Sequence, residues 1–353
     1  MATEEPSVIA ASCHANKIIS IHGLGKGFTA TPPPRPITLG QLFVQNIDPL
    51  TILEQKSRII AIANEYCPGM VKRGGGVIGM RVKQLENSGN VVVELQVDVC
   101  DAMGANCVNT ILAGLAGRLA AENAWSIPYK IVSNAAEGRV TTASFCIDLS
   151  TWQSKGIPGL EVARRIVQLN EWAKVDPSRA ITHNKGIYNG IEAVALATGQ
   201  DLRALHAAGH LYACKAGGSY QPLTEYRLLE GSLLQGTIEV ALPVATVGGC
   251  LVPCSVARAN LEFMGVGGSG ELACVMAAIG LGQNFAALRA IACEGIQEGH
   301  MFLHLQNVVN ATECTEKEEL LEELRRRKVH TQQGALAVAQ ELQKKREGVE
   351  QCE

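Results

Sequence analysis

The feature that most constrains the fold of this chain is the order of apolar periodicities between residues 37 and 148. Alternating apolar residues indicate half-buried strands, whereas apolar residues spaced by three and four indicate helices. The periodic segments are an extended run at 37–47, a helical pattern begun by Asp48 and Pro49, a hairpin with alternation at 78–83 and 93–99, a helical pattern at 108–119, and extended segments near 129–134 and 139–148. This strand-helix-strand-strand-helix-strand order predicts a ferredoxin-like split-βαβ unit on one antiparallel sheet and excludes the doubly wound dinucleotide fold.

The remainder of the chain is mainly helical, with extended segments around 226–248. Prolines at 32, 33, 34 and 36 end the N-terminal segment before the ferredoxin-like unit starts. A length of 353 residues suggests two domains at about 150 residues each. We therefore expect an α+β fold, in which residues 1–34 and 151–310 form a mainly helical large domain, residues 37–148 an inserted small domain, and residues 311–353 a helical C-terminal segment.

Charge, composition and cysteine usage exclude several classes of function. Lysine and arginine number 31 against 34 acidic residues, and no basic tract accompanies aromatic residues, so nucleic acid is not an expected partner. No apolar leader follows a basic start, and no uncharged stretch reaches the roughly 18 residues that span a bilayer, which predicts a soluble, cytoplasmic protein with no membrane contact. The 12 cysteines are scattered, and Cys250 and Cys254 lack zinc-site spacing, so no metal is expected.

Two glycine-containing segments are candidates for a cofactor loop. Residues 265–270 satisfy the dinucleotide fingerprint, but a helical pattern at 257–264 precedes them where a strand is required, so a turn between helices is the alternative. The better candidate follows the strand ending at Cys100 and begins the next helix, where free backbone N–H groups can receive a pyrophosphate. Its residues, for which an ordinary turn is the competing interpretation, are Asp101, Ala102, Met103, Gly104, Ala105 and Asn106.

Charged and polar side chains elsewhere suggest chemistry without defining it. Lys185 lies among polar residues before an apolar helix and could stabilise an oxyanion, with Asp201 returning to orient it; a surface lysine at a helix start is the alternative. The histidine pairs 206 and 210, and 300 and 304, have the spacing of two metal ligands on one helical face, but neither has a metalloprotease glutamate. His300 follows a glycine and could deliver a proton, or it could be an ordinary helical histidine.

Several long motifs taken together resemble one family. The segments are EEPS (4–7), DAMGAN (101–106), THNKGI (182–187), ATGQDLRA (197–204) and LGQNFAALRAIACEGIQEGHM (281–301). In this order they resemble 3-hydroxy-3-methylglutaryl-CoA reductase, and they are most similar to the soluble class II form. The resemblance covers nearly the whole chain and agrees with the predicted insertion, because that family binds its nicotinamide cofactor on such a small domain.

The resemblance implies an activity and its catalytic residues. The thioester of 3-hydroxy-3-methylglutaryl-CoA would be reduced to mevalonate and free coenzyme A by two hydrides from two NAD(P)H molecules, each leaving negative charge on the substrate oxygen. Lys185 would stabilise that oxyanion, Glu5 would supply a proton to it, and Asp201 would link and orient the two. His300 would protonate the departing thiolate.

The resemblance also implies binding residues and an assembly. Ser7, Arg179 and Asn189 would hold the hydroxymethylglutaryl end of the substrate, Arg179 through a bidentate pair with its carboxylate, and Gln283 lies in the family motif beside that pocket. Asp101 to Asn106 would cradle the dinucleotide. Residues 311–353 would form a flap that closes over the site, and the active sites would form in a homodimer.

Two departures from the family pattern lead to further expectations. Met1 to Glu5 lie well inside the family's large domain, so we expect an N-terminally truncated gene model or fragment; a catalytically silent fragment is the alternative function. NADH-preferring relatives carry an aspartate where alignment on Gly74, Gly75 and Gly76 places Cys67. The missing carboxylate, with Lys72 and Arg73 nearby to pair with a 2′-phosphate, predicts NADPH rather than NADH.

Other choices stay open in the sequence. A regulatory module that binds a small molecule on the ferredoxin-like unit would leave the lysine, aspartate and histidine motifs unexplained. The residues do not distinguish mevalonate synthesis from its breakdown, nor the size of the oligomer beyond a dimer.

Overall fold

A computed structural model describes residues 1–86, 88–214, 218–230, 232–293, 295, 305, 309–310, 312, 317–327, 329 and 331–350. The helices are α1 (Pro6–His22), α2 (Pro49–Glu54), α3 (Lys56–Glu65), α4 (Pro68–Lys72), α5 (Ala105–Asn123), α6 (Gly159–Val175), α7 (Pro177–Ala197), α8 (Leu202–Ala213), α9 (Ser255–Met264), α10 (Ser269–Cys293), α12 (Lys317–Arg327) and α13 (Gln332–Glu350), with 3-10 turns η1 (Glu137–Arg139) and η2 (Gly249–Leu251). The strands are β1 (Phe28–Thr31), β2 (Ile37–Gln45), β3 (Gly76–Gln84), β4 (Val91–Asp98), β5 (Ser126–Ser133), β6 (Val140–Asp148), β7 (Gln153–Ser154), β8 (Ile157–Pro158), β9 (Thr224–Leu229) and β10 (Leu233–Ala241).

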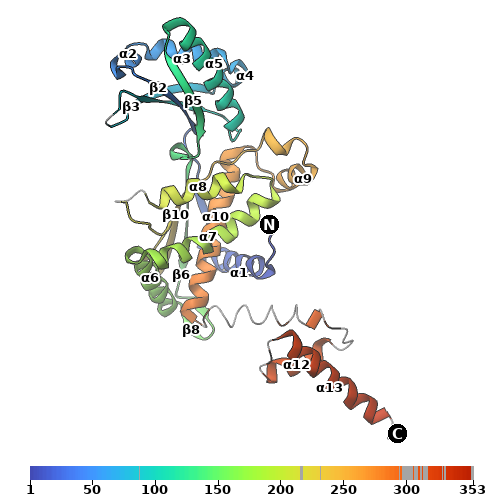
Figure 1. Cartoon of the computed structure of the whole chain (residues 1–353). Helices are drawn as coiled ribbons and strands as arrows, with labels where there is room; N and C mark the ends of the chain where they lie inside the picture. Colours follow the sequence, from blue (N-terminus) through green and yellow to red (C-terminus); the bar gives the residue numbers. More distant parts are fainter. Residues whose placement is uncertain are drawn as a thin grey trace.

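The small unit, residues 37–133, consists of β2 to β5 and the helices between them. Its sheet has the order β3-β4-β2-β5 with every pair antiparallel, and α2 to α5 lie at one end of the molecule with it (Figure 1). The side chains of α5 that were expected to face inward, including Ile111, Leu112 and Leu115, are fully buried against this sheet. The strand and helix order is therefore that of the predicted split-βαβ arrangement.

Local details of the small unit differ from the expected pattern. Asp48 caps α2 by accepting the Leu50 N–H at 2.9 Å, as predicted, but the helical pattern after it divides into α2, α3 and α4, and Leu53 is exposed. Ile78 is also exposed, because a register shift between Val77 and Gly79 reverses the alternation of β3 there.

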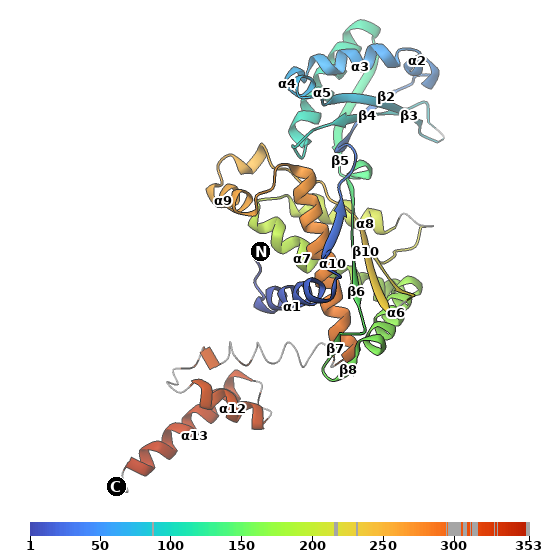
Figure 2. The same ribbon diagram turned by 180° about the vertical axis from the view of Figure 1, so that it is seen from behind.

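The large unit, residues 1–31 and 140–293, contains a second antiparallel sheet of order β1-β6-β10-β9. β6 was expected in the small unit, but it pairs with β10 along its whole length, from Val140 to Asp148. The place beside β2 in the small sheet is taken by β5, and the inward side chains of β6, Ala143, Phe145 and Ile147, pack into the large core instead. The chain crosses between the units twice, before β2 and after β5 (Figures 1 and 2).

Helix α10 is the centre of the large unit. It lies along the sheet, and α1, α6 and α7 pack around it. Glycines bring α7 and α10 close, since a Cβ on Gly190 would meet the Cβ of Gln283 at 2.9 Å and a Cβ on Gly280 would meet Ile191 at 3.0 Å. Helix α10 is long and apolar enough to cross a membrane by composition, but 67% of its most apolar window is buried in the molecule, as in the core helix of a globular protein.

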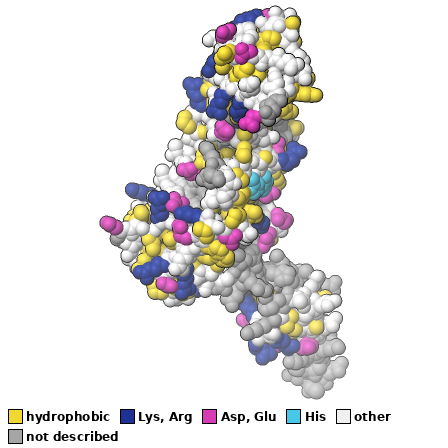
Figure 3. All heavy atoms as spheres, turned by 60° about the vertical axis from the view of Figure 1, so that its left-hand side comes forward, with side chains coloured by type: hydrophobic (Ala, Val, Ile, Leu, Met, Phe, Trp, Pro, Cys, Tyr) yellow, Lys and Arg dark blue, Asp and Glu magenta, His cyan; other side chains and the backbone are white. Residues whose placement is uncertain are grey.

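Helices α12 and α13 lie next to each other (Figure 2). Leu320, Leu324 and Ala335 belong to an apolar cluster separate from the other cores. The capping segment expected from Thr315 lies largely outside the described residues. On the face shown in Figure 3, Lys and Arg side chains are interspersed with Asp and Glu side chains.

Candidate active site

A cavity of about 450 Å³ lies between α1, α7 and α10 in the large unit. Six of the residues that the sequence singled out line it together, and they come from three segments far apart in the chain: Glu5, Ser7, Arg179, Lys185, Asn189 and Gln283. The cavity is partly open to water: Ser7 and Gln283 are buried, Glu5 and Arg179 are partly buried, and Lys185 is exposed.

Helix α7 contributes the largest share of the lining. Asp176 caps it by accepting the Ser178 N–H at 2.9 Å, and Pro177 occupies its first turn. The segment Thr182 to Ile187 therefore lies inside one continuous helix, and not ahead of it as expected. Helical spacing then places Arg179, Lys185 and Asn189 along the cavity.

Helix α1 supplies the carboxylate of the site. Glu5 occupies the N-cap position but makes no side-chain cap bond; its Oε1 accepts the Ser7 hydroxyl at 2.6 Å instead. The start of the chain is tied to α7 because the Ala2 N–H donates to the Ala193 carbonyl at 2.7 Å. Glu5 and Lys185 therefore line the same cavity although 180 residues separate them in the sequence.

The cavity contains polar atoms that the protein does not satisfy. Gln283 is 5% exposed, and its Oε1 has no hydrogen-bond partner among the described residues. The same holds for the Nδ1 of buried His183, whose Nε2 lies 2.5 Å from the Thr224 hydroxyl. Burial, with a smaller effect of Arg179, lowers the pKa of His183 to about 3 and keeps this imidazole neutral. Because both residues line the cavity, these unsatisfied polar atoms are consistent with a polar ligand there.

Arg179 is half-buried at the cavity, and desolvation lowers the pKa of its guanidinium, partly offset by Asp176. The guanidinium carbon lies 5.8 Å from the centre of the Trp172 ring, which orients it by a cation–π contact. An arginine held in this way presents a planar donor pair suited to a carboxylate.

Among the polar and charged side chains that line the cavity, sequence reasoning missed five: His14, Thr182, His183, Asn284 and Arg289. His14 lies on the same face of α1 as Ser7 and Ala11, so the helical spacing 7, 11, 14 could have identified it. Thr182 and His183 lie inside the THNKGI motif, and Asn284 and Arg289 inside the segment 281–301, but the resemblance implies no role for them.

The candidate cofactor loop, residues 101–106, connects β4 to α5 and also contacts the large unit. The Asp101 carboxylate accepts the Ser269 N–H at the start of α10 at 2.8 Å, and the Asp101 carbonyl accepts the Thr246 N–H at 3.0 Å. Gly104 has a φ of +102°, and a Cβ there would meet Val99 at 2.6 Å, so only glycine fits before α5.

The other glycine-rich segment is the turn between α9 and α10, so the helix-helix alternative describes residues 265–270. It nevertheless lies beside the cofactor loop, because a Cβ on Gly268 would meet the Asp101 carboxylate at 2.7 Å. The two glycine-containing segments therefore form one surface between the units.

Lys72 and Arg73 end α4 and are exposed, and the Arg73 carbonyl lies near the Cys100 thiol. Cys67, which alignment placed at the cofactor-selecting position, is instead buried in the small core, and burial raises the pKa of its thiol. Its side chain packs against α3, where the thiol lies near the carbonyls of Ala63 and Asn64.

Asp201 is not beside Lys185 in this chain. It caps α8 by accepting hydrogen bonds from the N–H groups of Arg203 and Ala204. The preceding residue, Gln200, is hydrogen-bonded to Ala245, and the next residue, Thr246, donates its N–H to the Asp101 carbonyl. Asp201 does not line the cavity with Lys185, since α7 continues for about 18 Å beyond Lys185, at 1.5 Å per residue, before Asp201 caps the next helix. His300 and His304 lie outside the described residues.

The histidine pair 206 and 210 does not gather metal ligands. The two rings stack with Tyr188, and His210 Nδ1 lies 2.7 Å from the Tyr220 hydroxyl. Within the described ranges, no group of three His, Cys, Asp or Glu side chains could hold a metal ion.

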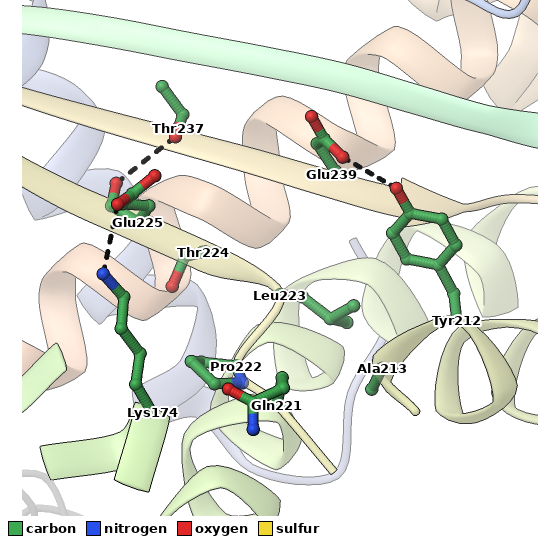
Figure 4. A pocket seen from close by; sticks show the side chains of 10 residues that line it. All are labelled: Lys174, Tyr212, Ala213, Gln221, Pro222, Leu223, Thr224, Glu225, Thr237 and Glu239. Atoms are coloured by element: carbon green, nitrogen blue, oxygen red, sulfur yellow. Dashed lines mark hydrogen bonds and ion pairs between the residues drawn. The ribbon is translucent and has the colours of Figure 1, made fainter. Parts of the chain in front are cut away.

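A second hollow, of about 550 Å³, opens between α6, α8 and the strands β9 and β10 (Figure 4). Its charged groups are already paired: Lys174 contacts Glu225 at 3.1 Å, and the Tyr212 hydroxyl donates to Glu239 at 2.7 Å. The cavity lined by Lys185 is therefore the better candidate for catalysis.

Comparisons with known proteins agree with this geometry. A family model described as hydroxymethylglutaryl-coenzyme A reductase matches residues 1–305. The chain is 41% identical over 315 residues to 3-hydroxy-3-methylglutaryl-coenzyme A reductase of Archaeoglobus fulgidus, covering 87% of this chain and 70% of that protein. It is 31% identical over 343 residues to the probable enzyme of Borreliella burgdorferi, covering 94% and 77%.

Among solved structures, the chain is similar to the class II 3-hydroxy-3-methylglutaryl-CoA reductase from Streptococcus pneumoniae bound to NADPH in open conformations. The TM-score is 0.77 at 36% identity, covering 97% of this chain and 83% of that one. Fold, site and relatives define an enzyme of the NAD(P)H-dependent oxidoreductase class. The chain belongs to the hydroxymethylglutaryl-coenzyme A reductase family.

Proposed function

We propose that this protein reduces the thioester of 3-hydroxy-3-methylglutaryl-CoA to mevalonate and free coenzyme A with two hydrides from NAD(P)H. The observation that carries the proposal is the cavity itself, where a carboxylate at the start of α1 and a lysine and an arginine of α7 line one volume. Reduction of a carbonyl at each of two steps needs a fixed cation, a proton source and an anchor for the substrate carboxylate, and this cavity contains all three.

Lys185 and Glu5 would act on the carbonyl oxygen. Hydride addition to the thioester carbon leaves an oxyanion, and the Lys185 ammonium stabilises it while Glu5 supplies a proton. Breaking the carbon–sulfur bond then returns the hydroxyl proton to Glu5 and releases the thiolate and an aldehyde, whose oxygen becomes anionic when the second hydride adds. Lys185 and Glu5 therefore serve both hydride-transfer steps. The Ser7 hydroxyl donates to the Glu5 carboxylate at 2.6 Å and keeps it oriented from one step to the next.

Arg179, Asn189 and Gln283 would position the substrate. The Arg179 guanidinium pairs with the terminal carboxylate, and the unpartnered Gln283 Oε1 accepts a hydrogen bond from the tertiary hydroxyl of the substrate. Proton delivery to the thiolate is assigned to His300 from the sequence alone. A thiolate protonated in this way attacks the aldehyde less readily, which favours the second reduction.

The loop at residues 101–106 fits a dinucleotide. It stands before the 19-residue helix α5, and within the described residues the N–H groups of residues 103–107 donate no hydrogen bond in the protein. Such N–H groups and the absence of a side chain at Gly104 suit a pyrophosphate. When bound, NAD(P)H supplies the hydride; Lys72 and Arg73 at the end of α4 would pair with the 2′-phosphate of NADPH.

The two halves of this site are far apart within one chain. Helix α10 begins at the cofactor loop and reaches Gln283 after 14 residues, a separation of roughly 21 Å at 1.5 Å per residue. Hydride transfer needs reacting atoms within about 3.5 Å. We infer that a second copy of the chain brings its cofactor loop and Asp201 to the cavity of the first, so that the active enzyme is a homodimer.

The direct test is NADPH oxidation in the presence of the thioester, with the Lys185→Ala variant. Loss of one preorganised charge at the oxyanion lowers kcat by about 100- to 1,000-fold. Lys174→Ala is the matched control, because Lys174 lies outside the cavity in ion pairs with Glu171 and Glu225. Wild-type kcat in Lys185→Ala would contradict the proposal, and a protein that binds NADPH but never oxidises it would favour the silent-fragment alternative.

A further inference from the structure

Arg139 is a buried charge at the junction of the two units. It ends η1, where the chain passes from β5 of the small unit to β6 of the large unit, and it is 2% exposed. Its backbone carbonyl accepts the Leu242 N–H at 2.9 Å, so the residue is fixed to the large unit by its main chain. Burying a guanidinium is costly unless its donors are used, so its partners identify what it stabilises.

The guanidinium joins three segments. Nη1 donates to the Val244 carbonyl of the large unit at 3.1 Å. Nη2 lies 3.1 Å from the Thr38 hydroxyl on β2, 2.9 Å from the Ala102 carbonyl and 3.0 Å from the Met103 carbonyl. Thr38 also donates to the Met103 carbonyl at 3.0 Å. The Ala102 and Met103 carbonyls of the cofactor loop therefore both accept hydrogen bonds from the Arg139 guanidinium.

This arrangement decides which side of the loop presents its N–H groups. A trans peptide directs its N–H opposite to its C=O, so turning the carbonyls of Ala102 and Met103 toward Arg139 leaves the N–H groups of Met103 and Gly104 on the other side. Those N–H groups have no acceptor among the described residues. They are the donors that a phosphate at this helix N-terminus would use.

We propose that Arg139 is a positioning residue for the cofactor: it holds the carbonyls of Ala102 and Met103 inward, which presents the loop N–H groups to the phosphates of the dinucleotide, and it fixes this loop to both units. The inference rests on the proposed function only in the identity of the ligand. Burial lowers the pKa of the guanidinium to about 10, partly offset by Asp98, and the side chain stays protonated at neutral pH. The positive charge of Arg139 on the carbonyl side of the loop also favours an anion on the N–H side.

The test compares Arg139→Met, Arg139→Lys and Thr38→Val with the unaltered protein. Arg139→Met removes the hydrogen-bond donors and the charge. The Kd of NADPH, measured by fluorescence titration, should then rise about tenfold or more, which is the effect of losing a hydrogen bond between a charged and a neutral group. Arg139→Lys keeps the charge but offers one nitrogen to these carbonyls, and it recovers part of the affinity. Thr38→Val removes a single partner and raises the Kd about fivefold.

Two further measurements separate positioning from a general loss of stability. Amide hydrogen exchange of residues 101–108, measured without cofactor, becomes faster in Arg139→Met while exchange in the α1–α7–α10 cavity is unchanged. Leu119→Ala, a buried change at the far end of α5, lowers the melting temperature but leaves the Kd of NADPH within about twofold.

The proposal is overturned if Arg139→Met binds NADPH like the wild type, or if Leu119→Ala weakens binding as much. A protein that binds no NADPH at any concentration would defeat the proposed function instead. Amide hydrogen exchange of residues 101–108 would then still test the role of Arg139. Equally slow exchange in the wild type and in Arg139→Met would show that Arg139 does not position the loop.

Discussion

Lys185 and Asp201, expected to act as a pair, are separated by the remaining length of α7: Lys185 lines the cavity, whereas Asp201 caps α8 beyond the end of that helix. Asp201 lies instead on the side of the cofactor loop, where Gln200 is bonded to Ala245 and Thr246 to Asp101. In the proposed homodimer, Lys185 of one chain would therefore meet Asp201 of the other.

A mixing experiment follows from this separation. Lys185→Ala and Asp201→Ala are each expected to be inactive alone. When the two are unfolded and refolded together, heterodimers restore one complete site out of two, so a mixture of equal parts regains about a quarter of the wild-type activity, because a two-fold dimer has two equivalent sites. Absence of recovery, with heterodimers shown to form by tagged copurification, would place both residues in one chain's site.

Substitution of Arg179 should affect substrate binding more than turnover. Arg179→Met removes the donor pair for the substrate carboxylate, and the KM for the thioester rises about tenfold to a hundredfold while the KM for NADPH stays constant. Arg164→Met is the matched control, since Arg164 lies exposed on α6 and forms only a 4.0 Å ion pair with Glu161. Equal changes in both KM values would show that Arg179 acts through the fold and not through the substrate.

Acid should destabilise the protein partly through His183. Its pKa is lowered from the usual 6.5 to about 3 in the folded protein, by burial and then by Arg179. Below pH 6.5 the unfolded chain binds a proton that the native state does not, so the free energy of unfolding falls as the pH decreases toward 3, with a limiting slope of about 1.4 kcal/mol per pH unit.

Urea unfolding of the wild type and His183→Gln at pH 7, 5 and 4 measures this contribution. The variant should lose less stability than the wild type over that interval. His22→Gln, a change at a histidine that contacts Thr151 near the surface, serves as the control and should keep the wild-type slope. A wild-type slope in His183→Gln would mean that this imidazole already carries its proton in the folded state.

Cofactor choice can be tested at the end of α4. Lys72 and Arg73 are exposed beside the cofactor loop, so replacing both with alanine should raise the KM for NADPH by about tenfold and leave the KM for NADH nearly unchanged, because only NADPH carries the 2′-phosphate. Lys56→Ala with Arg58→Ala, on α3 of the same unit, is the charge-matched control. A wild-type enzyme that strongly prefers NADH would refute the predicted preference for NADPH.

Local sequence determined the elements of this protein. The apolar spacing of Ile111, Leu112 and Leu115 predicted the buried face of α5, and Asp48 and Pro49 predicted the start of α2. The order of strands between residues 37 and 133 is the predicted one, although three short helices stand where one helical pattern was expected. These features depend on neighbours within one or two turns of the chain, where spacing and capping chemistry act directly.

The family motifs identified most of the pocket, although nothing in their spacing shows that Glu5, Lys185 and Gln283 meet. Only the close packing of α7 on α10 through Gly190 and Gly280, and of α1 beside them, brings these side chains to one cavity. Tertiary structure also assigned β6 to the large sheet, turned Cys67 into the small core, and put Arg139 beneath the cofactor loop. Contacts between distant segments depend on how whole surfaces fit together, which residue spacing along the chain does not record.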